Sequence, residues 1–434
     1  MQFNSLSAWL DWLEKNHPTE IDLGLERITR VAGRMGLLKP RAKVVTVAGT
    51  NGKGSCVAAT AALLGAAGFS VGVYTSPHLL HYNERIVVDG NPVADADICS
   101  AFETIYAACQ QTSAEHPAPI SLTYFEYGTL AALEIFRRQQ VTAMVLEVGL
   151  GGRLDAVNII DADVAVITSI ALDHTDWLGD NREAIGFEKA GIMRAGRPVV
   201  CADFSPPQSI LNHAQNLSAP LSLISRDFGY SVSDDVTWNW WRRDAQFSAQ
   251  PLPQLPLPSI SAALQVASIL GLDLLELDAF QCVAALRIPG RFQTLHWRDR
   301  QVILDVAHNP AATAYLVERL LQPQNDTTGL KTQGKVHGIV AMMADKDRAQ
   351  SLENLKPLVG AWYVADLAFI SRAAKVEQLR QDLVDLGVEI AFSGSVAECL
   401  QAAYENSNPG DRILIFGSFY TVAAGLQALA TATE

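Results

Sequence analysis

The strongest constraint on the fold is an apolar run that leads into a glycine-rich segment carrying a lysine. Lys43-Val-Val-Thr-Val-Ala48 predicts a buried strand, and Gly49-Thr-Asn-Gly-Lys-Gly-Ser55 follows it directly. An alanine- and leucine-rich helix is predicted from there to about residue 67. Glycines let backbone N–H groups turn inward, the start of a helix adds the positive end of its dipole, and Lys53 adds a full charge. This order of elements predicts a phosphate-binding loop.

The spacing of this loop differs from the usual expression G-x-x-x-x-G-K-[ST]. Gly49 and Gly52 stand closer together, and Gly54 separates Lys53 from Ser55. An ordinary glycine-rich turn is therefore the alternative, although the clear strand before it and the clear helix after it favour phosphate binding.

Strand and helix patterns alternate along both halves of the chain. The first half has predicted helices at 6–13, 25–38, 96–109 and 123–136, and further strands at 71–74, 143–147 and 164–168. The second half has predicted strands at 302–305, 336–341, 362–365, 389–392 and 413–416. Such alternation is typical of α/β proteins with parallel sheets.

We therefore expect two α/β domains. A P-loop-type parallel-sheet ATPase domain would span residues 1–290, with a small β-rich insertion at about 204–258 whose proline-rich end, 251–258, is an extended connection. Two helices would follow it, to about residue 286, and the segment 288–291 would be a turn or hinge. A smaller Rossmann-like α/β domain would span residues 291–434.

Composition narrows the possible partners. With 33 Lys and Arg against 46 Asp and Glu, the net charge is −13, which disfavours general nucleic-acid binding. The six cysteines show no C-x-x-C spacing, so we expect reduced thiols rather than disulfides or a zinc site. Residues 54–83 carry no charged side chain, but glycines and a proline interrupt them, which favours a buried helix and strand over a membrane span. The first twenty residues lack a signal-peptide pattern, so we expect a cytoplasmic protein.

Polar residues follow several predicted strands, where ligands bind in open α/β sheets. Ser76 follows one strand, Glu147 ends the next, and Asp173 and His174 follow a third. A carboxylate opposite a phosphate loop suits Mg²⁺ that bridges phosphates. The alternative for Glu147 is a surface ion pair. His174 is an uncertain ligand on these grounds, because Mg²⁺ prefers oxygen.

Lys189 lies on the apolar face of a helix predicted over residues 181–194. It stands four residues after Ile185 and three before Ile192, so the three side chains share one face. Burial lowers the pKa of an amine, and a neutral amine can add CO₂ to become a carbamate, a carboxylate-like group. The alternative, which composition alone favours, is a lysine that extends past the apolar stripe into solvent.

Together the motifs resemble a known family. The residues that carry the resemblance are Ala48-Gly-Thr-Asn-Gly-Lys-Gly-Ser55, Tyr74-Thr-Ser-Pro-His78, Leu146-Glu-Val-Gly-Leu-Gly-Gly-Arg-Leu-Asp155, Asp173-His-Thr-Asp-Trp-Leu178, Glu188-Lys-Ala-Gly191 and Asp305-Val-Ala-His-Asn-Pro310. In this order they resemble the folylpolyglutamate synthases of the Mur ligase superfamily. Asp22-Leu-Gly-Leu-Glu-Arg27 and Leu122-Thr-Tyr-Phe-Glu-Tyr-Gly128 are similar to the bacterial bifunctional dihydrofolate synthase/folylpolyglutamate synthases.

The resemblance implies an ATP-dependent amide ligase. ATP would phosphorylate a carboxylate to an acyl phosphate, which the amine of L-glutamate would attack. One substrate would be 7,8-dihydropteroate, giving dihydrofolate, and the other the glutamate tail of a tetrahydrofolate. Two Mg²⁺ sites and a monomer acting without nucleic acid or membrane are also implied, whereas a need for a monovalent cation such as K⁺ is left open.

The resemblance also assigns roles to residues. It implies that Lys53, Glu147, His174 and a carbamylated Lys189 are catalytic, and that the metal ligands are Ser76, Glu147 and His174. The implied ATP-binding residues are Gly49, Thr50, Asn51, Gly52, Lys53, Gly54, Ser55, Ser259, Arg291 and Asp305. The implied pterin- and folate-binding residues are Asp22, Arg85, Thr123, Phe125, Arg153, Leu154 and Asp155. His308 and Ser418 are weaker candidates for binding glutamate.

One position departs from the family. An asparagine usually lies near the adenine where this chain reads Pro258-Ser259-Ile260. Serine lacks the paired donor and acceptor of an amide, so a contact between Ser259 and adenine stays open.

Four alternatives to the bifunctional ligase are considered. The first is a folylpolyglutamate synthase without the dihydropteroate activity. The second is a Mur ligase acting on a nucleotide-linked muramoyl peptide, but about forty residues before the first strand are too few for its extra domain. A P-loop switch that hydrolyses nucleotide would leave the second α/β unit without a role. The fourth is a catalytically inactive folate-binding homologue.

Overall fold

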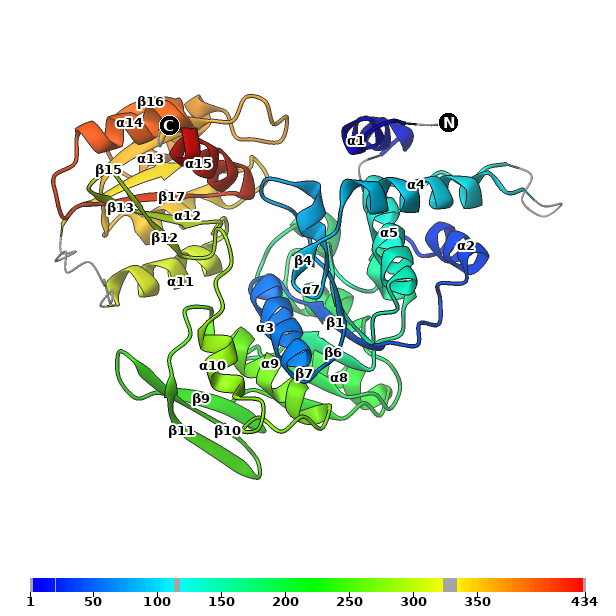
Figure 1. Cartoon of the computed structure of the whole chain (residues 1–434). Helices are drawn as coiled ribbons and strands as arrows, with labels where there is room; N and C mark the ends of the chain where they lie inside the picture. Colours follow the sequence, from blue (N-terminus) through cyan, green and yellow to red (C-terminus); the bar gives the residue numbers. More distant parts are fainter. Residues whose placement is uncertain (1–2, 20, 113–117, 323–333, 432–434) are drawn as a thin grey trace. The chain divides into compact units, whose positions relative to one another are not determined.

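The computed structural model describes residues 3–19, 21–112, 118–322 and 334–431 of the chain. Its contacts divide the chain into two compact units, Met1–Leu286 and Arg287–Glu434. Both are α/β units, as the strand and helix patterns predict (Figure 1). No helix within the described ranges is long and apolar enough to cross a membrane.

The first unit is built on one twisted sheet. Among the described residues it has eight strands in the order β4-β3-β2-β5-β1-β6-β7-β8. Their bounds are β1 (Lys43–Ala48), β2 (Val71–Tyr74), β3 (Ile86–Val88), β4 (Asn91–Pro92), β5 (Ala143–Glu147), β6 (Val164–Ile167), β7 (Val199–Cys201) and β8 (Leu221–Leu223). In this spatial order, each neighbouring pair from β2 through β5, β1, β6 and β7 to β8 is parallel. At the other edge, β3 pairs antiparallel with both β2 and β4. The predicted strands at 43–48, 71–74 and 143–147 are confirmed, and the antiparallel edge was not predicted.

Helices cover both faces of this sheet (Figure 1). Their bounds are α1 (Leu6–Asn16), α2 (Glu26–Met35), α3 (Lys53–Ala66), α4 (Asp95–Gln110), α5 (Tyr124–Arg138), α6 (Thr175–Leu178), α7 (Arg182–Ala190), α8 (Gln208–Asn216), α9 (Leu257–Ile269) and α10 (Ala279–Ala284), with 3₁₀ turns at Tyr82–Arg85 and Ala156–Ile159. One core cluster joins α1, α2, α4 and α5 to Val44, Met144 and Leu146. Since Val44 and Ala48 point to the same side of β1, the cluster of α7 and α8 around Ala48 covers the same face. The helices α3 and α9 pack together on the other face.

The segment predicted as a β-rich insertion is only partly so. A separate antiparallel sheet has the order β11-β10-β9, with bounds β9 (Phe228–Val232), β10 (Thr237–Arg242) and β11 (Ala245–Pro251). Its buried Trp238 and Trp240 pack on Phe280 of α10, with ring centroids 6.3 Å apart in both pairs.

Two parts of that prediction are wrong. Residues 208–216 form α8, whose buried Ile210 and Ala214 belong to the α7 and α8 cluster, and β8 joins the main sheet. The proline-rich run ends inside a helix, because α9 already begins at Leu257. Pro258 is tolerated there because the first turn of a helix needs no N–H donor.

The second unit is a six-stranded sheet in the described part of the chain, with the order β12-β13-β17-β14-β15-β16. Its strands are β12 (Gln293–Trp297), β13 (Arg300–Asp305), β14 (Val336–Val340), β15 (Val359–Asp366), β16 (Ile390–Ser395) and β17 (Arg412–Phe416). Its helices are α11 (Pro310–Leu321), α12 (Arg348–Leu355), α13 (Val376–Asp385), α14 (Val396–Glu405) and α15 (Phe419–Thr431). The predicted strands are confirmed within a few residues, and the antiparallel strand β12 was not predicted.

Candidate active site

The candidate site lies where four neighbouring parallel strands of the first unit end. The strands β2, β5, β1 and β6 are adjacent, and Val47 pairs with Glu147 while Ala48 pairs with Ile167. Their C-terminal ends therefore line up at one edge. Ser76 follows β2, Glu147 ends β5, the glycine-rich loop follows β1, and His174 follows β6. The topology thus brings together most residues singled out at predicted strand ends.

Hydroxyl groups beside the loop fix its backbone. Thr168 Oγ1 donates to Asn51 O at 2.7 Å, and Ser169 Oγ donates to the same oxygen at 3.2 Å. From α9, Ser259 Oγ donates to Gly52 O at 3.1 Å. These carbonyls therefore point away from the concave side of the loop. Because the first N–H groups of α3 have no partner within the helix, they can be donated to phosphate oxygens.

Two lysine ammonium groups meet at the start of the loop. Lys53 Nζ donates to Gly49 O at 3.1 Å, and Lys189 Nζ donates to the same oxygen at 2.9 Å. Lys189 is buried, with 4% of its surface exposed. Burial, and then the charge of Lys53, lower the pKa of Lys189 to about 7, while Asp173 and Asp155 oppose the shift. The prediction that Lys189 lies on the buried face of its helix is confirmed, although α7 ends at Ala190 rather than at residue 194.

Among the candidate metal ligands Ser76, Glu147 and His174, only Glu147 is a carboxylate. Ser76 N donates to Glu147 Oε2 at 3.3 Å, and the Glu147 side chain is buried. His174 caps α6 in the left-handed region, with φ 51°, and its N–H donates to Asp173 Oδ1 at 2.9 Å. Within the described ranges, no three His, Cys, Asp or Glu side chains form a cluster that could hold a metal ion by themselves. One carboxylate beside a hydroxyl suits Mg²⁺, which takes its remaining ligands from water and substrate phosphates.

The candidate pterin residues Asp22 and Thr123 are linked by an arginine that sequence reasoning missed. Arg27 donates to Asp22 Oδ2 at 2.5 Å and to Glu126 Oε1 at 3.2 Å. Glu126 in turn caps α5, accepting from Thr123 N at 2.8 Å while its own N–H donates to Thr123 Oγ1 at 3.2 Å. His17 Nε2 lies 3.1 Å from the same Asp22 oxygen. Arg27 therefore holds the Asp22 loop against the start of α5.

Phe125 and Asp155 both contact the glycine-rich segment after β5. The Phe125 ring packs 5.8 Å from Tyr74, and a Cβ at Gly149 would overlap with it. Asp155 is buried and accepts from Leu150 N at 2.8 Å and Val157 N at 3.0 Å, so it holds this segment in place. Burial raises the pKa of Asp155 to about 6.

The remaining candidates of the first unit have partners within the protein. Leu154, between Arg153 and Asp155, is half-buried. Arg153 pairs with Glu188 at 2.9 Å, one residue before Lys189. Arg85 Nε donates to His78 Nδ1 at 2.8 Å, and its guanidinium lies over the Tyr82 and Tyr124 rings. Burial and the charge of Arg85 lower the pKa of His78 to about 4, so this histidine stays neutral and can accept.

The second unit gathers its own candidates at one sheet edge. The strands β13 and β17 are parallel neighbours in which Asp305 pairs with Phe416. Asp305 accepts from Phe292 N at 2.7 Å and Ala307 N at 2.8 Å, and burial raises its pKa while Arg291 opposes that shift. His308 Nδ1 lies 2.8 Å from Val306 O. Ser418 follows β17, and its hydroxyl lies 2.7 Å from that of Thr421.

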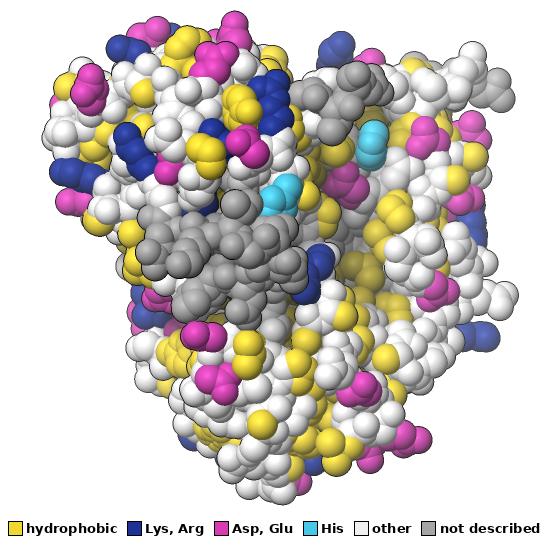
Figure 2. Space-filling view, turned by 60° about the vertical axis from the view of Figure 1, so that its left-hand side comes forward, with side chains coloured by type: hydrophobic (Ala, Val, Ile, Leu, Met, Phe, Trp, Pro, Cys, Tyr) yellow, Lys and Arg dark blue, Asp and Glu magenta, His cyan; other side chains and the backbone are white. Residues whose placement is uncertain are grey.

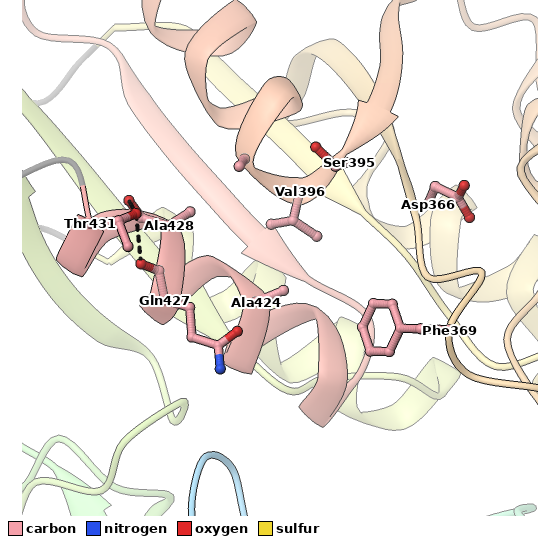
Figure 3. A pocket seen from close by; sticks show the side chains of 9 residues that line it. Asp366, Phe369, Ser395, Val396, Ala424, Gln427, Ala428 and Thr431 are labelled. Atoms are coloured by element: carbon pink, nitrogen blue, oxygen red, sulfur yellow. Dashed lines mark hydrogen bonds between the residues drawn. The ribbon is translucent and has the colours of Figure 1, made fainter.

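A separate cavity in the second unit offers less chemistry. It has a volume of about 280 Å³ between α15 and the start of α14, and Phe369, Val396 and Ala424 supply apolar walls (Figure 3). Glu398 already caps α14, accepting from Ser395 N at 2.8 Å, so this helix start is closed to an external anion. On the face of the protein shown in Figure 2, acidic and basic side chains are mixed with apolar ones.

Comparisons with known proteins agree over the whole chain. The family model described as the Mur ligase middle domain matches residues 47–232, and the Mur ligase, glutamate ligase domain matches residues 290–419. The dihydrofolate synthase/folylpolyglutamate synthase of Escherichia coli K12 is 44% identical over 426 residues, which cover 98% of this chain and 95% of that protein. The protein of the same name from Haemophilus influenzae is 37% identical over 438 residues and 96% of each chain.

Solved structures give the same result. E. coli FolC in complex with DHPP and ADP superposes with a TM-score of 0.91 at 42% identity and covers 100% of both chains. A bifunctional folylpolyglutamate synthase/dihydrofolate synthase with Mn, AMPPNP and L-glutamate bound has a TM-score of 0.89 at 43% identity, over 99% of each chain. With two family models and full-length relatives in agreement, the chain belongs to the Mur ligase family, in the branch of the dihydrofolate synthase/folylpolyglutamate synthases.

Proposed function

We propose that the protein is an ATP-dependent amide ligase that adds L-glutamate to 7,8-dihydropteroate and to the glutamate tail of tetrahydrofolates. The substrate carboxylate takes the γ-phosphoryl group of ATP, which leaves ADP and an acyl phosphate. The glutamate amine then attacks the acyl carbon, loses a proton and expels phosphate, so that an amide bond replaces the acyl–phosphate bond. Two anions must approach each other in the first step, which makes charge neutralisation the main requirement.

The observation that carries this proposal is the buried amine of Lys189 beneath the phosphate loop. A simple nucleotide hydrolase has no need of a second, desolvated lysine on the carbonyl that Lys53 already contacts. A neutral amine of pKa about 7 can add CO₂, losing one proton and becoming a carbamate. Lys189 would then place a negative group at the site, since the charge of the reacting side chain changes from 0 to −1.

Each unit has its own part in the proposal. In the first, Gly49–Ser55 bind the ATP phosphates, and the candidate pterin residues bind dihydropteroate, Phe125 by stacking. In the second, Arg291 and Asp305 contact the nucleotide, and His308 and Ser418 contact the incoming glutamate. We further propose a cytoplasmic monomer, as the family resemblance implies.

The divalent metal belongs to the same proposal. Relatives have been solved with Mn and AMPPNP bound. Ser76, Glu147 and His174 would hold two Mg²⁺ ions, with Glu147 common to both, and a monovalent cation such as K⁺ would bind elsewhere. Bound Mg²⁺ would neutralise phosphate charge during transfer. Within the chain, the N–H of Ser76 donates to Glu147 Oε2 and so orients the carboxylate at this edge.

The test is phosphate release from MgATP by the purified full-length protein with L-glutamate. Dihydropteroate and tetrahydrofolate are supplied in separate reactions, and mass spectrometry identifies the products. We expect release and a one-glutamate extension in both. Release with tetrahydrofolate alone would restrict the enzyme to folylpolyglutamate synthesis. Phosphate release that does not depend on glutamate would contradict the ligase and favour the nucleotide-hydrolysing switch.

Replacing Glu147 by glutamine should weaken the binding of Mg²⁺. The change keeps the shape of the side chain and removes the charge that attracts the cation. We expect the Mg²⁺ concentration for half-maximal phosphate release to rise about tenfold or more, because this site has few other charged ligands. Titration of Mg²⁺ into metal-stripped protein checks this. An unchanged Mg²⁺ requirement would remove Glu147 from the metal site.

Replacing Arg27 by glutamine should impair pterin binding selectively. Without the guanidinium, the Asp22 loop loses its link to Glu126 and hence to the start of α5. We expect the KM for dihydropteroate to rise about tenfold, the cost of a charge-assisted hydrogen bond, with the KM for ATP unchanged. Arg30→Gln is the matched control, because Arg30 lies one turn further along α2 and pairs with Glu26 of the same helix. Equal effects of the two variants would refute the role of Arg27.

A further inference from the structure

The phosphate loop is held from outside by residues distant in the sequence. The Thr168 hydroxyl, just after β6, donates to Asn51 O at 2.7 Å, and the Ser259 hydroxyl, in the first turn of α9, donates to Gly52 O at 3.1 Å. Both side chains are buried, each with 3% of its surface exposed. Gly52 O also accepts from Cys56 N at 3.0 Å, which begins the hydrogen bonding of α3.

The two hydroxyls also explain the two loop glycines. A Cβ at Gly49 would overlap with Thr168 Oγ1, and a Cβ at Gly52 would overlap with Ser259 Oγ. Both glycines have positive φ, 151° and 83°, which side chains disfavour. The two glycines therefore leave the space that the Thr168 and Ser259 hydroxyls occupy. The carbonyl of Asn51 is turned towards the end of β6, and that of Gly52 towards α9.

We infer that Ser259 and Thr168 are positioning residues that set the loop N–H groups for the nucleotide phosphates, and that Ser259 does not select the base. This inference rests on the proposed ATP site. A serine hydroxyl has a single proton to donate, and Ser259 spends it on Gly52 O. The hydroxyl therefore has no proton left for a ring nitrogen of the base, and its contact with the loop backbone places its effect at the phosphates common to all nucleoside di- and triphosphates.

The test is equilibrium binding of ADP and GDP with Mg²⁺ to the full chain, measured by titration calorimetry on Ser259→Ala and Thr168→Val. Each change removes one hydroxyl at little cost in volume. Ser261→Ala is the matched control, because Ser261 is a buried serine of the same helix whose hydroxyl has no partner among the described residues. Thermal melts of each variant report whether the fold is kept.

We expect the Kd of ADP to rise about five- to tenfold in both variants, the effect of one lost buried hydrogen bond. The Kd of GDP should rise by the same factor, so that the ratio of the two constants stays that of the wild type. Ser261→Ala should bind both like the wild type.

Three results would overturn the inference. A changed ADP-to-GDP ratio in Ser259→Ala, with the ratio kept in Thr168→Val, would make Ser259 a base contact. Wild-type binding in both hydroxyl variants would show that neither hydroxyl positions the loop. Should Ser259→Ala fail to fold, Thr168→Val still tests the positioning role, and Ser259→Cys replaces the alanine variant in the comparison of ADP with GDP. A wild-type protein that binds neither nucleotide would refute the ATP site itself, whereas binding without glutamate-dependent phosphate release would refute only the ligase.

Discussion

Replacing Lys189 by alanine is expected to lower glutamate-dependent phosphate release by about two to three orders of magnitude, the usual effect of losing one preorganised charged group. The amine lies beneath the phosphate loop and donates to Gly49 O, to which Lys53 Nζ also donates. If a carbamate is the working form, short carboxylates such as acetate should restore part of the rate in the alanine variant. Mass spectrometry of tryptic peptides under CO₂ provides an independent readout.

Addition of CO₂ to Lys189 should depend on pH in one direction. Because burial lowers the pKa of Lys189 to about 7, the neutral amine that takes up CO₂ decreases as the pH falls below 7. Activity at limiting CO₂ should therefore fall on the acidic side, and added bicarbonate should restore it. Lys43→Ala is the control, since Lys43 is exposed and begins β1 at the opposite edge of the sheet. Full activity of the Lys189→Ala protein would contradict the proposed role.

Replacing Lys53 by methionine is expected to lower kcat/KM for ATP by about two to three orders of magnitude as well, because a full charge next to the phosphates is lost. The substitution should also change the pKa of the neighbouring Lys189. The charge of Lys53 contributes to the low pKa of Lys189, so its removal should raise that pKa and move the acidic limb of activity to higher pH. Initial rates of the residual activity across pH, at fixed CO₂, measure both effects.

Lys53→Arg is the matched variant for that experiment. It keeps the positive charge on the loop, so the acidic limb should stay near that of the wild type even if the rate falls. If the acidic limb of the pH–activity profile does not move in Lys53→Met, the charge of Lys53 does not affect the pKa of Lys189.

The sequence predicted best what local pattern determines. Apart from Thr46, the buried part of Lys43–Ala48 is apolar, and β1 has the bounds expected of it. Lys189 shares a helical face with Ile185, and both are buried. The short antiparallel strand β12 and the helix α8 were missed or misassigned, because such short elements are stabilised by distant neighbours rather than by their own periodicity.

The contacts that fix the candidate site were less accessible to sequence reasoning. Thr168 and Ser259 contact the loop from 117 and 207 positions away in the chain, and Arg27 reaches Glu126 over 99. Thr168 carried one signal, since polar residues at strand ends in parallel sheets face the ligand edge. The resemblance placed Ser259 near the nucleotide and Arg27 in a pterin-side motif, but nothing in their own segments indicates which carbonyl or carboxylate they contact.

The dependence of the loop on β6 and α9 limits how it could be reused in protein engineering. Grafting Gly49–Ser55 alone onto another strand–helix unit would transfer the residues without the hydroxyls that turn two of their carbonyls aside. The graft would keep two conformationally permissive glycines and would have to order them on binding nucleotide. The smallest transferable module is therefore discontinuous, and comprises the loop, the end of β6 and the first turn of α9.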